Sequence, residues 1–239
     1  YGKLSPKLAE KLWKLIEPFA AYGFNKAHAA SYGKVAYQTA YMKANFPAIY
    51  MSAVLTADSG DVEKIAEIIT ECKRMAIPVL PPDINESFAG FSVVKGTDGE
   101  KDKIRFGLTT IKNFGEGITN TIVEERKNPP AGGGHFKSLE DFLTRIKDRN
   151  LNKKSLEALI KSGALDLFGE RGILLFNLER ILEYHKESAV ESNHDSLFGS
   201  LSSVNSLSLV PAEEISIKER LTWEKELLGL YISGHPLDV

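Results

Sequence analysis

The sequence contains a single cysteine, Cys72, and no long uninterrupted run of apolar residues. One cysteine permits neither an intrachain disulfide nor a cluster of thiolate metal ligands, and it fits a reducing compartment. A membrane-spanning helix needs about 18 or more consecutive apolar residues. We therefore expect no membrane partner and a cytoplasmic location.

Residue patterns typical of catalytic and metal sites are also missing. The five histidines show no metal-ligand spacing, and no two aspartates alternate on a strand as two-metal phosphoryl transfer requires. Cys72 lies on an apolar helical stripe, which is typical of a packed thiol and not of a nucleophile. We expect no metal, no cofactor and no catalysis by this chain alone.

Charge is close to balanced, with a formal net charge of −2, but it is unevenly distributed. Residues 1–50 and 101–186 are basic, whereas 51–100 and 187–239 are acidic. This alternation argues against a generic nucleic-acid binder of high pI and allows a basic face on part of the molecule. The chain opens at Tyr1 with no initiator Met and no signal peptide, so we expect a piece of a longer protein.

Helix signals fill the first third of the chain. Ser5-Pro6 is typical of a helix start, because the hydroxyl caps free N–H groups and proline suits the first helical position. Asn25 caps a second helix that stops before Pro47, and a shorter helix covers about 47–57. Asp61 caps a fourth helix. Its apolar face is formed by Val62, Ile65, Ile69, Cys72 and Met75.

The rest of the sequence combines a short β element with more helices. Three prolines between 77 and 82 enforce extended backbone, and apolar runs on both sides of Thr97-Asp98-Gly99 indicate a small β-hairpin. Short helices return over 109–187, residues 187–216 have the composition of a flexible linker, and a last helix covers about 213–230. The predicted fold class is mainly α.

The segment from Asn25 to Tyr32 is the first candidate site. Asn25 caps a helix whose first turn presents free backbone N–H groups, and Lys26 and His28 stand beside this positive end. A helix N-terminus with a nearby lysine is suited to binding an anion. The alternative, a solvated cap with a partly buried histidine, stays open.

The segment Leu108–Ile118 resembles a helix-hairpin-helix unit, in which two helices flank a tight glycine-containing turn. Asn113 replaces the first glycine, and asparagine tolerates the left-handed backbone conformation well. The small residues let a phosphate approach the backbone N–H groups of Gly115 to Gly117, and Lys112 adds positive charge.

A similar unit follows at Leu156–Leu165, with Lys161 and Gly163 at its turn and Lys153-Lys154 ahead of it. One such turn is weak support, since any pair of helices can be joined through glycine. Two turns within 50 residues, each beside a lysine, favour binding to duplex phosphates.

The third candidate is His194–Gly199, which lies in the predicted linker. A Leu-Phe pair exposed in polar sequence costs solubility unless a partner buries it, so the segment indicates a peptide anchor. The alternative is that the pair folds back onto its own domain.

Several motifs together resemble one family. They are Phe24–Ala29, Tyr37–Tyr41, Leu80–Asn85, Ile111–Gly117, Leu159–Ala164 and Leu228–Pro236. In this order they resemble the bacterial replicative DNA polymerase III alpha subunits, the C-family DNA polymerases, over essentially the whole chain.

The resemblance implies four regions. Residues 1–80 would be the C-terminal part of the polymerase fingers, 81–108 an extended or β-hairpin connector, and 109–187 a tandem helix-hairpin-helix duplex-binding domain. Residues 188–239 would hold a linker with a clamp-binding peptide and a terminal helix leading to an OB fold. The palm with its catalytic aspartates would lie upstream. The fragment would thus be inactive alone, and magnesium and dNTPs would act in the intact enzyme.

The resemblance also implies roles for the candidate residues. Asn25, Lys26, His28 and Tyr32 would lie near the incoming nucleotide or the template. The hairpins at Lys112–Gly117 and Lys161–Ala164 would hold duplex without reading its sequence. The implied partners are double-stranded primer-template DNA, the beta sliding clamp and other polymerase III holoenzyme subunits.

The family's clamp-binding peptide usually begins with glutamine, and here the equivalent position is His194, followed by Ser196, Leu197 and Phe198. We expect weaker polar anchoring at the start of the peptide, with the Leu197-Phe198 plug intact.

Two other classes of function stay open from the residues alone. One is a stand-alone helix-hairpin-helix accessory protein for DNA binding or repair. The other is a purely structural helical interaction module, in which the hairpin lysines would be dispensable. The salt dependence of DNA binding separates the structural module from the two DNA binders.

Overall fold

A computed structural model describes residues 3–21, 26–97, 99–127, 134–191, 206–234 and 236–237. The chain divides into two compact units, residues 1–47 and residues 48–239. Each unit is described separately below.

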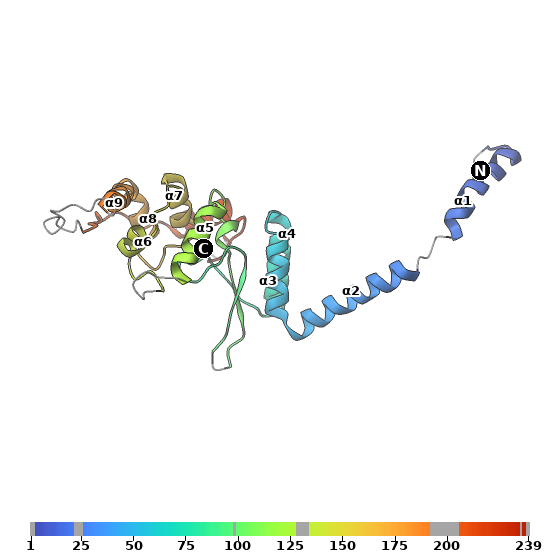
Figure 1. Cartoon of the computed structure of the whole chain (residues 1–239), viewed down its shortest axis with the longest axis horizontal. Helices are drawn as coiled ribbons and strands as arrows, with labels where there is room; N and C mark the ends of the chain where they lie inside the picture. Colours follow the sequence, from blue (N-terminus) through green and yellow to red (C-terminus); the bar gives the residue numbers. More distant parts are fainter. Residues whose placement is uncertain are drawn as a thin grey trace. The chain divides into compact units, whose positions relative to one another are not determined.

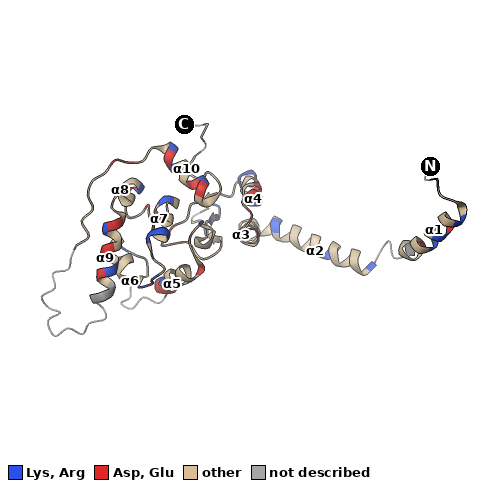
Figure 2. Ribbon diagram, turned by 90° about the horizontal axis from the view of Figure 1, so that it is seen from above, with Lys and Arg blue, Asp and Glu red and all other residues tan. Residues whose placement is uncertain are grey.

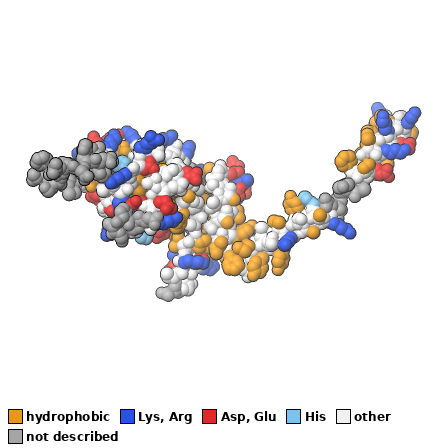
Figure 3. All heavy atoms as spheres, viewed as in Figure 1, with side chains coloured by type: hydrophobic (Ala, Val, Ile, Leu, Met, Phe, Trp, Pro, Cys, Tyr) orange, Lys and Arg blue, Asp and Glu red, His pale blue; other side chains and the backbone are white. Residues whose placement is uncertain are grey.

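The described residues of the first unit form two helices, α1 (Pro6–Ala21) and α2 (Lys26–Asn45). The predicted start of α1 is confirmed, since the Ser5 side chain accepts a hydrogen bond from the backbone N–H of Leu8 at 3.3 Å. None of the α2 residues is buried, and Figure 3 shows hydrophobic side chains gathered along this helix. The exposed large ones on α2 are Tyr32, Val35, Tyr37, Tyr41 and Met42.

Helix α3 (Pro47–Ala57) begins at the last residue of the first unit and otherwise belongs to the second, where α4 (Val62–Arg74) follows it. The predicted cap of α4 is confirmed, because the Asp61 carboxylate accepts the backbone N–H of Lys64 at 3.2 Å. Ile65, Ile69 and Cys72 of its predicted apolar face are buried, whereas Val62 is 49% exposed. The helix therefore packs through a narrower face than the sequence predicts.

A three-stranded sheet follows, formed by β1 (Val79–Leu80), β2 (Ser92–Val94) and β3 (Lys103–Arg105) in the order β1-β3-β2. The antiparallel pair β2–β3 is the predicted hairpin. The parallel pairing of β1 with β3 was not predicted. Proline cannot donate a hydrogen bond, but its carbonyl still accepts one, and the Pro78 oxygen receives the backbone N–H of Ile104 at 2.9 Å.

The remaining elements form a helical cluster, which Figure 1 shows around α7 (Lys153–Ser162). They are the 3₁₀ turn η1 (Leu108–Thr110), α5 (Glu116–Lys127), α6 (Leu139–Arg145), α8 (Arg171–Phe176), α9 (Leu178–Glu191) and α10 (Ile217–Leu228). Leu156 and Leu159 of α7 are fully buried, and α7 contacts α8, α9 and α10. The predicted mainly α fold is confirmed.

The segment 206–216 differs from the flexible linker predicted over 187–216. Helix α9 continues to Glu191, and residues 206–216 lie extended on the core. The Asn177 side chain accepts the backbone N–H of Val210 and donates to its carbonyl, both at 2.8 Å. Leu207 and Leu209 also pack against the core. A buried amide and two apolar side chains thus hold on the core a segment that was predicted to be a linker.

A buried polar loop, residues 83–87, joins several of these elements. The Asn85 side chain accepts the backbone N–H of Phe136 at 2.7 Å and donates to the Phe136 carbonyl at 2.9 Å. Arg126 of α5 donates to the carbonyls of Ile84 and Ser87, and the backbone N–H of Ile84 donates to Ala164 O at 2.9 Å. Burial lowers the pKa of Arg126.

Removal of the Asn85 amide tests the importance of this loop. We expect Asn85→Ala to lower the free energy of unfolding by about 2–4 kcal/mol, because two buried backbone groups of Phe136 lose their partner. Urea denaturation measures the change. Asn120→Ala, at an exposed position of α5, is the control and should change stability by less than about 0.5 kcal/mol. Equal effects of the two substitutions would contradict the role given to Asn85.

Candidate nucleic-acid interface

The first predicted hairpin presents an exposed polar turn on a buried apolar base. Ile111 and Phe114 are buried, 1% and 5% exposed, and they fix the turn on the core. Lys112 and Asn113 between them are exposed. Asn113 has φ +70°, the left-handed conformation that the sequence predicts for it.

The element before this turn is not the predicted α-helix but the three-residue turn η1. The backbone N–H groups of Leu108 and Thr109 donate to Phe88 O and Ala89 O, at 2.9 and 3.1 Å. Gly107 permits this approach, since a Cβ there would lie 2.4 Å from Ala89 O. A helix cannot continue from η1, because Ile111 has extended backbone with ψ 119° and the N–H of Lys112, which would donate to Leu108 O in an α-helix, donates to Leu227 O at 2.9 Å. The hairpin thus joins a packed loop to α5.

The N-terminus of α5 is open to an incoming ligand. An added Cβ at Gly115 or Gly117 would meet nothing within 4 Å. The backbone N–H groups of residues 115–117 donate to no acceptor in the described part of the chain. Glu116, also exposed, places a carboxylate in the same first turn. The turn therefore combines open amides, one lysine and one opposing acid.

The second predicted hairpin is arranged differently. Gly163 ends α7 with φ +86°, and its backbone N–H donates to Ile160 O at 3.1 Å. The residue is buried, and a Cβ added there would lie 2.2 Å from an Arg171 guanidinium nitrogen. The structure thus places Gly163 in the interior, with its N–H group already bonded within the helix end.

Arg171, which the sequence analysis did not single out, fixes this turn. It is 2% exposed and donates to both Asp166 carboxylate oxygens at 2.8 Å and to Lys161 O at 3.1 Å. A third partner is Glu224 of α10, 1% exposed, at 3.4 Å. Burial alone would lower the pKa of Arg171, but Asp166 and Glu224 together raise it. An arginine eight residues after a glycine turn is no recognisable sequence signal.

The predicted lysines of the second hairpin differ in their availability. Lys161 is half-buried, lies 2.6 Å from Glu157 and contacts the Trp223 ring. Lys153 pairs with Glu179, and the hydrogen bond raises the pKa of this lysine. Lys154 is exposed, and its side chain has no partner among the described residues. Figure 2 shows basic positions on α7 and mixed charge on α9 and α10.

The candidate residues of the first unit lie on α2. Lys26, His28 and Tyr32 are all exposed, and the His28 and Tyr32 ring centroids are 4.3 Å apart. The partly buried histidine of the alternative interpretation is therefore not observed at His28. Asn25 lies outside the described residues.

The predicted clamp-binding residues His194, Ser196, Leu197 and Phe198 also lie outside the described residues. The described chain on either side is held on the core. Before them, α9 packs through Ile181 and Leu182; after them, Asn177 holds Val210.

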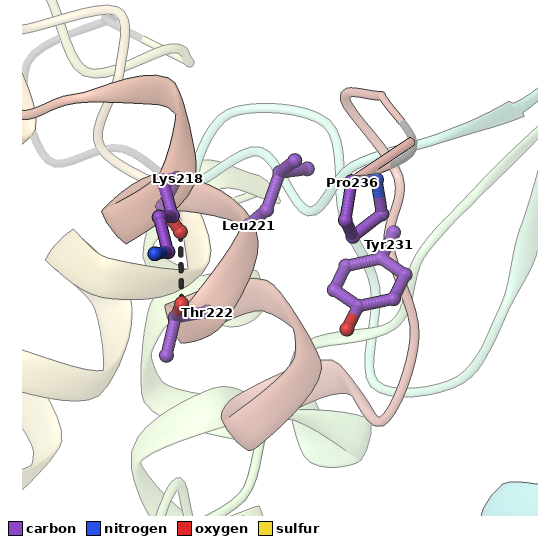
Figure 4. A pocket seen from close by; sticks show the side chains of 5 residues that line it. All are labelled: Lys218, Leu221, Thr222, Tyr231 and Pro236. Atoms are coloured by element: carbon purple, nitrogen blue, oxygen red, sulfur yellow. Dashed lines mark hydrogen bonds between the residues drawn. The ribbon is translucent and has the colours of Figure 1, made fainter. Parts of the chain in front are cut away.

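A pocket of about 420 Å³ lies beside α10, away from the predicted site residues. Figure 4 shows Lys218, Leu221 and Thr222 on the helix facing Tyr231 and Pro236, which follow it. The Thr222 hydroxyl donates to Lys218 O at 2.8 Å. Among the described residues that line the pocket, Lys218 is the one cation and none is a carboxylate, so these residues form no set of metal ligands.

Two further kinds of feature are missing from the described residues. These residues contain no group of three or more His, Cys, Asp or Glu side chains arranged to hold a metal ion. No helix among them is both long enough and apolar enough to cross a bilayer.

Comparison with known proteins links this geometry to a family. Residues 76–172, which hold both hairpins, match the family model described as a helix-hairpin-helix motif. The chain is 45% identical to a DNA polymerase III subunit alpha of Thermus aquaticus over 96% of its length and 18% of that protein. It is 44% identical to the Campylobacter jejuni protein of the same name, over 96% of this chain and 19% of that protein.

A third relative, the Pseudomonas aeruginosa DNA polymerase III subunit alpha, is 40% identical over 97% of this chain and 21% of that protein. The chain spans about a fifth of the length of these relatives. Over nearly all of its residues, this chain belongs to the DNA polymerase III alpha subunit family.

Proposed function

We propose that this chain is the duplex-binding part of a DNA-directed DNA polymerase. The observation that carries the proposal is the exposed turn Lys112–Gly117, with open backbone amides, inside a helix-hairpin-helix match. In the proposed role, the turn holds phosphates of the duplex behind the site of synthesis. Phosphate contacts position a protein on DNA without carrying sequence information.

The physical basis is the N-terminus of α5. Free N–H groups and the helix dipole attract an anion there, and the glycines keep side chains from blocking its approach. Lys112 supplies the full positive charge, which makes binding dependent on salt. Glu116 opposes the phosphate, so we expect the turn alone to bind weakly and in concert with other contacts.

Replacement of Lys112 tests this proposal directly. We expect Lys112→Ala to weaken binding to duplexes of unrelated sequence equally and to flatten the log–log salt slope by about 0.9, the value for one phosphate contact. Fluorescence anisotropy of a labelled duplex, titrated at several salt concentrations, measures both quantities.

The opposite change provides a matched comparison at the same turn. Glu116→Gln removes a like charge beside the bound phosphate, so it should tighten binding. Lys101→Ala removes one exposed lysine from the β2–β3 hairpin and should leave binding unchanged. If Lys112→Ala and Lys101→Ala titrate alike, the turn is not a phosphate site and the structural module becomes the better interpretation.

The second hairpin has a smaller part in the proposal. Lys161 is paired with Glu157, and Gly163 is buried. Lys154 is therefore the main cation that the second hairpin offers to DNA. Lys153 joins it when a phosphate displaces Glu179. Gly163 then serves the backbone geometry of the turn.

The first unit is proposed to face the nucleotide or the template in the longer polymerase. The supporting observation is that Lys26, His28 and Tyr32 are exposed together at the start of α2, with Asn25 before them. A cation and two rings there suit a triphosphate and a base. Magnesium and dNTPs would be bound by the longer protein, and polymerisation would depend on carboxylates outside this chain.

That dependence yields a prediction for the isolated chain. With a primed template, magnesium and dNTPs, it should extend no primer, because the two-metal mechanism needs paired carboxylates. Denaturing gels of labelled primer measure extension. Product formation that persists through a further purification step would contradict this assignment.

A sliding clamp is the proposed protein partner, and His194, Ser196, Leu197 and Phe198 are the proposed contacts. A Leu-Phe pair is suited to filling an apolar pocket. Both ends of the segment 192–205 join chain that is fixed on the core, so the peptide would tether the clamp to the duplex-binding unit over a short reach.

Alanine substitutions test the clamp contact. Leu197→Ala with Phe198→Ala should abolish association with purified clamp in gel filtration, since the apolar plug is lost. The matched control, Leu201→Ala with Val204→Ala, removes apolar groups from the same segment outside the peptide and should leave the complex intact. A complex that survives the first pair of substitutions would refute the assignment.

A further inference from the structure

The loop between α6 and α7 carries two cations that belong to neither hairpin turn. Lys147 and Arg149 are exposed, and neither side chain has an ion pair or hydrogen bond among the described residues. The loop is fixed at both ends, because Ile146 and Leu151 are buried, 0% and 3% exposed. The chain between two buried anchors must therefore present Lys147 and Arg149 to solvent.

The only acid of this loop, Asp148, is occupied by hydrogen bonds. One carboxylate oxygen accepts the backbone N–H and the side-chain amide of Asn150, at 2.8 and 2.9 Å. The other accepts the Thr121 hydroxyl of α5 at 2.8 Å. Burial opposes the shift, but these hydrogen bonds, together with the charge of Arg149, lower the pKa of Asp148. The carboxylate thus shapes the loop while the two cations point away from the core.

The contact with Thr121 places this loop beside the first hairpin. The same hydroxyl lies 3.2 Å from Gly117 O, so Asp148 and Gly117 are both in direct contact with one oxygen atom. Thr121 follows Gly117 by about 6 Å along the helix axis, at about 1.5 Å per residue. Charges on one DNA strand repeat about every 3.4 Å along the duplex axis, so the turn and the loop can reach phosphates of the same strand.

We infer that Lys147 and Arg149 bind DNA phosphates next to the one held at Lys112–Gly117. The inference rests on the proposed duplex binding and extends that site beyond the two hairpin turns. The fixed loop places two cations beside a turn that has only Lys112 and an opposing Glu116. The loop therefore supplies the larger share of the charge at this end of α5.

The test compares two double variants of equal charge in the whole 239-residue chain. Lys147→Ala with Arg149→Ala removes two proposed contacts. The control, Lys95→Ala with Lys103→Ala, removes two cations from the β2–β3 hairpin. Anisotropy of a labelled duplex is measured at 50 and 200 mM salt, and circular dichroism checks that both variants are folded.

We expect the loop variant to flatten the salt slope by about 0.9 per lost contact, which reduces the ratio of the two affinities about tenfold. The control should behave as the unsubstituted chain. A second outcome is that the unsubstituted chain binds in a salt-dependent way and Lys112→Ala weakens this binding, but the loop variant matches the control. In that case the inference about the loop fails while the proposed duplex binding stands. If the unsubstituted chain shows no salt-dependent binding, the proposed function fails as well.

A charge-neutral substitution tests the placement of the loop. Thr121→Val removes the hydrogen bond to Asp148 and keeps every charge. We expect weaker duplex binding although every charge is kept, because the loop loses its fixed position beside Gly117. Binding identical to that of the unsubstituted chain would show that the loop does not need this position, which would overturn the geometric argument.

Discussion

The second unit depends on the hydrogen bonds of one buried polar loop, residues 83–87. Buried backbone groups need partners, and most loops avoid that requirement by lying on the surface. Here the partners come from four distant segments: Phe106 of the β3 end, Arg126 of α5, Phe136, and Ala164 at the second hairpin. The loop therefore links α5, which follows the first hairpin, to the turn of the second hairpin.

Features that depend on neighbours within a few residues were predictable from the sequence. The Asp61 cap, the start of α1 at Pro6 and the left-handed backbone of Asn113 are all confirmed, because each follows from local sterics or a local hydrogen bond. The β2–β3 hairpin is confirmed for the same reason. In each case the deciding atoms lie close together in the chain.

Features that depend on distant partners were not predictable. A helix before the first hairpin is excluded by Leu227, whose carbonyl accepts the N–H of Lys112 that a helix would direct to Leu108 O. The segment 206–216 is ordered by Asn177, some 30 residues earlier. Composition carries no information about this buried amide, which belongs to another part of the core.

The two hairpin turns illustrate the same limit at the candidate site. Both sequences place glycine beside lysine, and the pattern alone gives them the same role. In the structure, glycine at 115 and 117 leaves open space, whereas glycine at 163 leaves room for the Arg171 guanidinium. A missing Cβ serves a ligand in one case and a buried side chain in the other, so the identity of the group that fills the space decides which glycine is available to DNA.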